Sequence, residues 1–214
     1  MTVQKHSSEV LIVGAGLSGL ALATQLINKD IDVQVVEARS RSGGRMYSVA
    51  SVKNNIDSAY FDMGPSWIWP GQPLIKNLLE SMNIDVFEQY STGNLVYEDD
   101  QALVRRDYDY STMAGSLRID GGMQRIINRL KDSLPESSVL ESHQLMGVKT
   151  HGDTISATVE TFQNTIQFQT KKIVFCVPPR LAATSISFQP KLPSDVIQSL
   201  KSIPTWMAGH GKLT

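Results

Sequence analysis

The sequence predicts an α/β fold organised around a parallel β-sheet, and three features near its start support this. Residues 10–13 form a short apolar run that ends at a glycine, as expected of a buried parallel strand. Over residues 17–27, apolar side chains recur at helical spacing. Residues 31–36 then alternate apolar and polar side chains, which is typical of a strand. Strand, helix and strand within about 30 residues make a βαβ unit, whose crossover makes the two strands parallel neighbours.

The rest of the chain predicts further elements without an internal repeat. A loop rich in Ser, Gly and Arg covers residues 39–48, and a hairpin with an acidic turn is expected over 94–105. Helices are expected over residues 74–82, from 121 to just before Pro135, and over 192–200; strands are expected over 156–161, 165–169 and 172–177.

Composition limits the class of protein. The chain has 214 residues, of which 41% are hydrophobic and 19% charged, as in a soluble globular protein of one domain or one and part of a second. The formal net charge of -1, without a basic run, gives no reason to expect a nucleic acid or membrane partner. The uncharged residues 10–28 carry three glycines and several polar residues, which disfavours a spanning helix.

Cysteine and histidine usage exclude other kinds of site. Cys176 is the only cysteine, so an intramolecular disulfide and a structural zinc cluster are excluded, and a reducing compartment such as the cytoplasm is expected. The four histidines show no spacing suited to a metal site, so no metal is expected.

A glycine motif joins the first predicted strand to the first helix. Gly14-Ala15-Gly16-Leu17-Ser18-Gly19 matches GxGxxG. Gly14 permits a tight turn, Gly16 lets the backbone approach a pyrophosphate, and Gly19 lets helix and strand pack closely. The helix N-terminus offers N–H groups and a positive dipole end to phosphates. The motif predicts a Rossmann-like dinucleotide site; the alternative is a glycine-rich turn that binds nothing.

Glu37 ends the second predicted strand, near the offset at which such sites carry an acid. Its carboxylate can accept hydrogen bonds from ribose hydroxyls. The same charge would repel a 2′-phosphate, which argues against NADP.

The segment that begins at Glu37 indicates which dinucleotide the site would bind. Its residues, Glu37-Ala38-Arg39-Ser40-Arg41-Ser42-Gly43-Gly44-Arg45, resemble the flavin-containing amine oxidase family, which has the glutathione-reductase type of FAD-binding fold. The resemblance implies FAD, with Arg39 near the ribose, Gly43 and Gly44 passing close to the cofactor, and Arg45 and Met46 beside the diphosphate. A solvated basic loop is the alternative.

A second stretch, Phe61-Asp62-Met63-Gly64-Pro65-Ser66-Trp67, resembles the family's Asp-x-Gly-x-x-Trp segment. The resemblance implies that Met63, Gly64, Pro65, Ser66 and Trp67 line the isoalloxazine ring. For Trp67 and Trp69 a core aromatic cluster is the competing interpretation.

Three later positions take roles from the same resemblance. Leu145 stands where the family has a valine whose backbone contacts adenine, and Val177 stands in the strand that ends beneath the cofactor. Lys212 stands where the family has a lysine near the reactive nitrogen of the flavin, and an exposed terminal lysine is the alternative. Cys176 is expected to be a buried structural residue and not a flavin attachment site.

The resemblance also implies a domain plan. Residues 1–75 and 121–180 are expected to form the FAD-binding domain, and 76–120 and 181–214 parts of a substrate domain. It covers nearly all of this chain but about half of a typical member, so a companion chain or homo-oligomer could complete the site.

The function implied is hydride transfer from an amine to FAD, with reoxidation by oxygen. Three alternatives stay open: a flavin-binding remnant without turnover, a related flavoprotein desaturase or oxidase, and an NAD-binding module, which the 39–45 loop disfavours.

Overall fold

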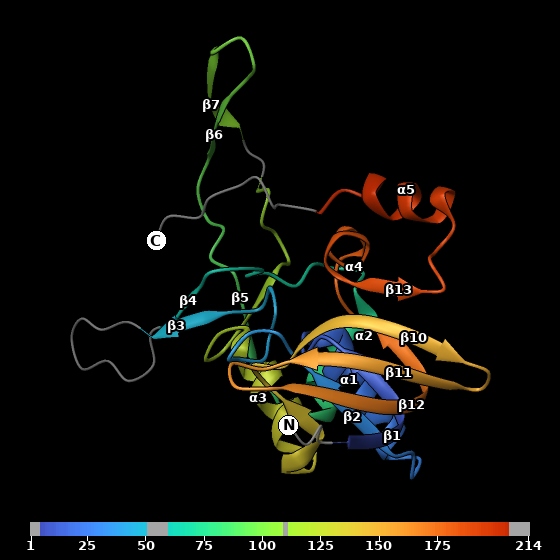
Figure 1. The fold of residues 1–214 in the computed structure, drawn as a ribbon. Coiled ribbons are helices and arrows are strands. Elements are labelled where there is room, and N and C mark those ends of the chain that lie inside the picture. The colour runs from blue at the N-terminus through green and yellow to red at the C-terminus, as the bar shows by residue number, and fades with distance from the viewer. Residues whose placement is uncertain (1–4, 51–59, 109–110, 206–214) are drawn as a thin grey trace. The chain divides into compact units, whose positions relative to one another are not determined.

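The computed structural model describes residues 5–50, 60–108 and 111–205. The chain divides into two compact units, and Figure 1 labels helices and strands of both. Unit 1 comprises residues 1–47 and 126–214, and unit 2 comprises residues 48–125.

Unit 1 is built on a seven-stranded sheet with the order β13-β10-β11-β12-β1-β2-β9. Its strands are β1 Lys5–Val13, β2 Val33–Val36, β9 Val139–Leu140, β10 Gln144–His151, β11 Thr154–Glu160, β12 Thr165–Phe175 and β13 Ser187–Gln189. Its helices are α1 Leu17–Ile27, most of α3 Gln124–Asp132, the 3-10 helix η1 Glu136–Ser138, α4 Pro179–Ser185 and α5 Ser194–Ser202.

The predicted βαβ unit is confirmed. β1 pairs in parallel with β2, from Val10 opposite Val33 to Val13 opposite Val36. β12 and β9 extend the parallel part on either side, so β12, β1, β2 and β9 end at the same edge. The α/β fold class with a parallel sheet is therefore correct, with an antiparallel extension that the sequence analysis did not specify.

That extension is the meander β10-β11-β12, in which adjacent strands run antiparallel. Ala157, Val159, Ile166 and Phe168 point to one face and join the apolar core with residues of the parallel strands. On the other face, Ser156 bonds Gln169 and Thr158 bonds Gln167. The period of two in these strands thus separates a buried face from a polar one.

One prediction about the strands was wrong. Residues 165–169 and 172–177 were expected as two strands, but β12 is continuous to Phe175. Lys171 and Lys172 break the apolar alternation, yet the ladder to β1 continues through them because its hydrogen bonds are made by the backbone. Thr170, which is buried, donates its hydroxyl to the carbonyl of Glu9 at 3.0 Å.

Unit 2 contains three two-stranded sheets and one helix in its described residues. The pairs are β3 Ser48–Ala50 with β4 Tyr60–Asp62, β5 Val86–Glu88 with β8 Leu117–Ile119, and β6 Leu95–Glu98 with β7 Val104–Tyr108; the helix is α2 Pro73–Ser81.

The hairpin expected over residues 94–105 is confirmed, but its second strand begins later, at Val104. Ala102 has a positive φ of 60°, and Asp99 Oδ1 accepts hydrogen bonds from the N–H groups of Gln101 and Leu103. These contacts lengthen the turn and move Ala102 and Leu103 out of the strand.

Across the described residues, no helix has the length and apolar character needed to cross a bilayer. The same part of the chain holds no cluster of three or more His, Cys, Asp or Glu side chains arranged to hold a metal ion.

Candidate cofactor site

The turn between β1 and α1 needs glycine at position 14. Gly14 has φ 104°, and its N–H donates to the carbonyl of Val36 at 2.8 Å. A Cβ there would stand 2.9 Å from the carbonyl oxygen of Cys176 and 3.0 Å from Cγ1 of Val177. Cys176 and Val177, which directly follow β12, therefore lie against this turn.

Gly19 is required by helix packing. A Cβ at Gly19 would stand 2.0 Å from the carbonyl oxygen of Gly14 and 3.3 Å from Cγ2 of Ile12. The first turn of α1 passes over the end of β1 at a distance that no side chain permits.

Gly16 differs from Gly14 and Gly19 in its backbone conformation and in the space around it. It is the N-cap of α1, with φ −80° and ψ −177°, a conformation that any residue adopts. The nearest atom to an added Cβ would be the carbonyl oxygen of Gly43, at 3.9 Å. None of the described residues requires glycine here, so the missing side chain leaves room for something else.

The start of α1 is suited to an anion. No side chain caps this helix end, and its first turn carries no acidic residue. Leu17 is partly buried and Ser18 is exposed at this end. The backbone N–H groups of a first turn carry the positive end of the helix dipole, which favours a phosphate.

Glu37 lies immediately after β2 and is only 7% exposed. Its Oε2 accepts a hydrogen bond from the N–H of Ala15, and its Oε1 accepts one from the N–H of Arg39, both at 2.9 Å. Ala38, between the two, is exposed. Each carboxylate oxygen can accept more than one hydrogen bond, so these contacts leave capacity for a ribose hydroxyl.

The loop after Glu37 folds back onto the glycine turn. Gly43 and Gly16 form a parallel β-bridge, and the N–H of Gly43 donates to the carbonyl of Ala15 at 2.8 Å. Gly44 has φ 57°, and a Cβ on it would stand 3.5 Å from Cα of Gly16. The N–H of Met46, a buried residue, donates to the carbonyl of Gly43 at 2.9 Å. Two glycine-containing turns thus meet at one place.

Three arginines belong to this loop, and they differ in their contacts. Arg39 and Arg41 both donate to the carbonyl of Gly44, at 3.4 and 3.1 Å. The guanidinium of Arg41 also lies over the ring of Tyr47, 4.3 Å from its centroid. Arg45 is exposed, and within the described residues it makes no recorded hydrogen bond or ion pair. Its charge is available to an anion.

Glu141, just after β9, anchors the same loop and was missed in the sequence. Its Oε1 accepts hydrogen bonds from the N–H and Oγ of Ser42, at 2.8 and 2.7 Å. Nζ of Lys131 lies 2.7 Å from the same oxygen. Burial acts to raise the pKa of the Glu141 carboxyl, but the bonds from Lys131 and Ser42 outweigh it and leave this pKa lowered. The pairing of β9 with β2 brings Glu141 to this edge.

The predicted flavin-facing segment lies in unit 2. Met63 and Trp67 are 38% and 43% exposed, Pro65 is exposed, Gly64 is half-buried and Ser66 is buried. Trp69 is 39% exposed, and Nε1 of Trp67 donates to Oε1 of Gln89 at 2.9 Å. Both tryptophans are thus at the surface of unit 2, so the interpretation of a core aromatic cluster was wrong.

A buried carboxylate, Asp62, fixes the start of this segment. It accepts hydrogen bonds from Oγ of Ser48 at 2.6 Å and from the N–H of Met123 at 2.8 Å, and it lies 3.5 Å from the guanidinium of Arg118. Gly122 has φ 82°, and a Cβ on it would stand 2.7 Å from Oγ of Ser48. Glycine at position 122 therefore leaves room for Ser48 to contact Asp62.

The remaining predicted residues are placed as follows. Leu145, in β10, is 4% exposed and packs in the core of unit 1 with Val13 and Val36. Lys212 lies outside the described residues.

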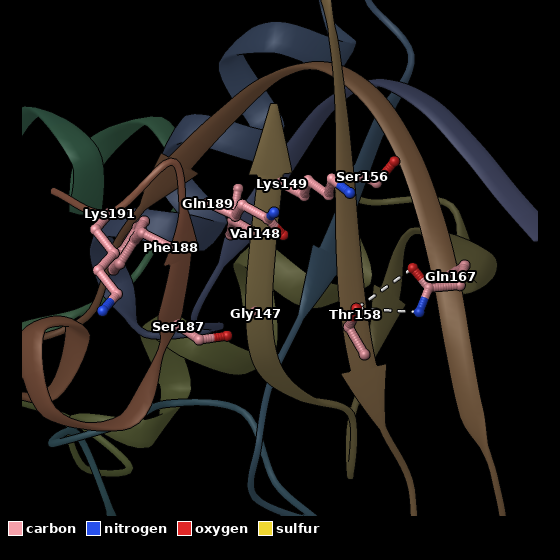
Figure 2. A pocket seen from close by; sticks show the side chains of 10 residues that line it. All are labelled: Gly147, Val148, Lys149, Ser156, Thr158, Gln167, Ser187, Phe188, Gln189 and Lys191. Atoms are coloured by element: carbon pink, nitrogen blue, oxygen red, sulfur yellow. Dashed lines mark hydrogen bonds between the residues drawn. The ribbon is translucent and has the colours of Figure 1, made fainter. Parts of the chain in front are cut away.

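A pocket of about 510 Å³ lies elsewhere, on the polar face of the meander and β13 (Figure 2). Its lining includes Lys149, Thr158, Gln167, Ser187 and Lys191. It contains no residue of the two glycine turns, so the candidate cofactor site rests on backbone geometry and not on this hollow.

Comparison with known proteins gives a family. A model of flavin containing amine oxidoreductases matches residues 17–105 and 86–213. Putrescine oxidase of Kocuria rosea is 35% identical over 89 residues, which are 42% of this chain and 18% of that protein. Amine oxidase (flavin-containing) A of Canis lupus familiaris is 33% identical over 95 residues, 44% of this chain and 17% of that protein.

Solved structures share the fold. Wild-type putrescine oxidase bound to putrescine aligns with a TM-score of 0.75 at 22% identity, over 92% of this chain and 64% of that one. Cyclohexylamine oxidase from Brevibacterium oxydans aligns with a TM-score of 0.76 at 17% identity, over 90% and 62%. The chain thus spans less than two thirds of these oxidases. It belongs to the family of flavin-containing amine oxidoreductases, a membership that implies FAD as its cofactor.

Proposed function

We propose that unit 1 holds the ADP half of FAD at the meeting point of its two glycine turns. The observation that carries the proposal is the open space beside Gly16, where an added Cβ has no neighbour closer than 3.9 Å. Gly14 and Gly19 shape the protein itself, whereas the lack of a side chain at Gly16 serves only a ligand that comes close to the backbone.

The charges around this space favour a diphosphate. The N-terminus of α1, with Leu17 and Ser18, contributes backbone donors, and the exposed Arg45 contributes a full positive charge. Glu37 stands on the ribose side, followed by Ala38 and Arg39. Gly43, Gly44 and Met46 bring the backbone of the second turn close to the cofactor.

The flavin end of the proposal follows the resemblance to the family. We infer that Met63, Gly64, Pro65, Ser66 and Trp67 face the isoalloxazine ring, as in the family, and that Leu145 and Val177 complete the cofactor-binding set. The exposure of Met63 and Trp67 supports this role, because large apolar side chains at a surface favour a bound apolar partner. The FAD-binding domain would then include residues 1–75 and 121–180, and the substrate domain 76–120 and 181–214.

For the whole protein we infer oxidation of an amine. Bound FAD would accept a hydride from the substrate and pass electrons to oxygen. Lys212 is the proposed residue near the reacting atoms. Putrescine, bound by one solved structure of the same fold, is the first amine to try. The single cysteine suits a reducing compartment, and the cytoplasm is the proposed location.

The test separates cofactor binding from turnover. The purified chain is titrated with FAD, and binding is followed by flavin fluorescence and visible absorption. Arg45→Met should weaken binding about tenfold or more, the scale of a lost charged hydrogen bond. Arg106→Met, which removes an exposed arginine of unit 2, should not. Wild-type chain that takes up no FAD contradicts the proposal.

Turnover is measured next, by adding putrescine to the flavin-loaded chain without oxygen. Bleaching of the flavin absorption supports amine oxidation. Tight flavin binding without bleaching by putrescine or other small amines favours a flavin-binding chain that does not turn over by itself, or one completed by a companion chain.

A further inference from the structure

One carboxylate outside the second glycine turn accepts hydrogen bonds from the residue that precedes its two glycines. Oε1 of Glu141 receives three donors, the N–H and Oγ of Ser42 and Nζ of Lys131, all within 2.8 Å. These residues come from the 38–46 loop, from the end of β9 and from α3, so the cluster joins three separate segments of unit 1. We name it the Glu141 cluster.

The contact of Glu141 with Ser42 matters because of where Ser42 lies in the loop. Ser42 directly precedes the two glycines and Arg45, the most flexible part of the loop by composition. Upstream, the N–H of Ser142 donates to the carbonyl of Arg39 at 2.8 Å; downstream, Gly43 bonds Ala15. Glu141 fixes Ser42, which lies between these two backbone contacts.

Among the described residues, the side chains of Arg39 and Arg41 make contacts within the loop and do not tie it to the rest of unit 1. Arg39 and Arg41 hold the carbonyl of Gly44, but both belong to the loop and move with it. Glu141 and Lys131 lie outside it, on the scaffold. Ser42 is 5% exposed, so loss of its acceptor would leave a buried N–H and hydroxyl without a partner.

The charge of the cluster is balanced. A carboxylate beside an anion-binding loop would weaken that loop's attraction for a diphosphate. Nζ of Lys131 lies 2.7 Å from Oε1 of Glu141 and offsets its negative charge. Glu141 therefore does not cancel the positive charge of Arg45. The side chains of Glu141 and Lys131 are 27% and 42% exposed, so the pair is partly screened by solvent.

We propose that Glu141 is a positioning residue for FAD binding, which holds Ser42 so that Gly43, Gly44 and Arg45 stand ready for the diphosphate. This inference rests on the proposed function and adds the residue that preorganises its phosphate-binding loop. Glu141 acts through Ser42, with Lys131 as its counter-ion.

The experiment compares FAD affinity and local backbone protection in three variants of the full chain. Glu141→Ala should weaken FAD binding about tenfold or more, the scale for leaving buried donors unpaired. Glu141→Gln, which keeps an acceptor for Ser42, should recover most of that loss. Glu136→Ala, at an exposed glutamate of η1, should bind as the wild type does.

Hydrogen exchange supplies a readout that a general loss of stability would not give. In Glu141→Ala the amides of residues 42–46 should exchange faster, while those of β1 keep their protection. The inference is overturned if Glu141→Ala folds, binds FAD with wild-type affinity, and keeps the amides of residues 42–46 as protected from exchange as in the wild type. Equal losses in β1 and the loop would also overturn it, because Glu141 would then act on global stability. Failure of the wild type to bind FAD would instead contradict the proposed function.

Discussion

One carboxylate oxygen of Glu37 accepts a hydrogen bond from the backbone N–H of Ala15 at 2.9 Å, across 22 residues of sequence. The contact ties the end of β2 to the middle of the glycine motif. Because Ala15 lies between Gly14 and Gly16, the acid that the sequence places near a ribose also fixes the turn that would face the pyrophosphate. Contacts within the protein thus hold the turn in this shape.

Glu37→Ala should destabilise the chain as well as weaken FAD binding. It leaves the N–H groups of Ala15 and Arg39 without their acceptor, a loss worth about 1–3 kcal/mol in the free energy of unfolding. Glu37→Gln keeps one carbonyl acceptor and should lose less. Urea unfolding of the flavin-free chain measures both, and equal stability of wild type and Glu37→Ala would contradict the structural role.

The glycines of the first motif should separate into structural and ligand-facing positions. Gly19→Ala places a Cβ 2.0 Å from the carbonyl oxygen of Gly14 and should cost about 1–3 kcal/mol or more, the scale of overpacking. Gly16→Ala meets nothing within 3.9 Å and should cost under about 1 kcal/mol, the scale of an N-cap change. Thermal or urea unfolding without FAD measures the stability lost in each variant. A Gly16→Ala variant less stable than Gly19→Ala would contradict the prediction.

In unit 2, Gly122→Ala should be more damaging than Gly93→Ala. Both positions have positive φ, which costs an alanine about 1–2 kcal/mol. At Gly122 the new Cβ also meets Ser48 and Asp62, whereas at Gly93 nothing lies within 4 Å. The difference between the two unfolding free energies isolates the steric term. Equal values would show that the contact of Ser48 with Asp62 does not depend on Gly122.

Acid should remove the contribution of Glu141. Since the native pKa of its carboxyl is lowered, its stabilisation is complete above the ordinary glutamate pKa. That stabilisation falls away as the pH drops from there through the lowered native value. Urea unfolding from pH 7 down to about pH 3 should therefore show wild type and Glu141→Gln converging only at the acid end. A difference that stays constant with pH would contradict the assignment, and Glu136→Gln controls for the loss of one charge.

The central βαβ unit could be predicted because its information is local. Apolar periodicity, a glycine at each required bend and an acid at the end of β2 all lie within residues 10–37. The short strands β3, β9 and β13, of two or three residues, carry too little pattern to be recognised. β12 was divided in two because Lys171 and Lys172 interrupt an alternation that the backbone ladder ignores.

The contacts around the site were harder to foresee. Ser42 and Glu141 are 99 residues apart, and Asp62 and Met123 are 61 apart. Such pairs depend on strand order, which sequence periodicity does not encode. The motif already assigned Gly14 to a tight turn, Gly19 to packing and Gly16 to a ligand, and the structure adds the distances that distinguish them.

The most direct measurement of the central claim is the FAD affinity of Gly16→Val set beside Gln25→Val, a matched change on the exposed face of the same helix. Titration by flavin fluorescence, with unfolding curves for both variants, separates binding from folding. The account predicts that Gly16→Val folds but loses FAD, while Gln25→Val binds it as the wild type does. A folded Gly16→Val that binds FAD with unchanged affinity would contradict it.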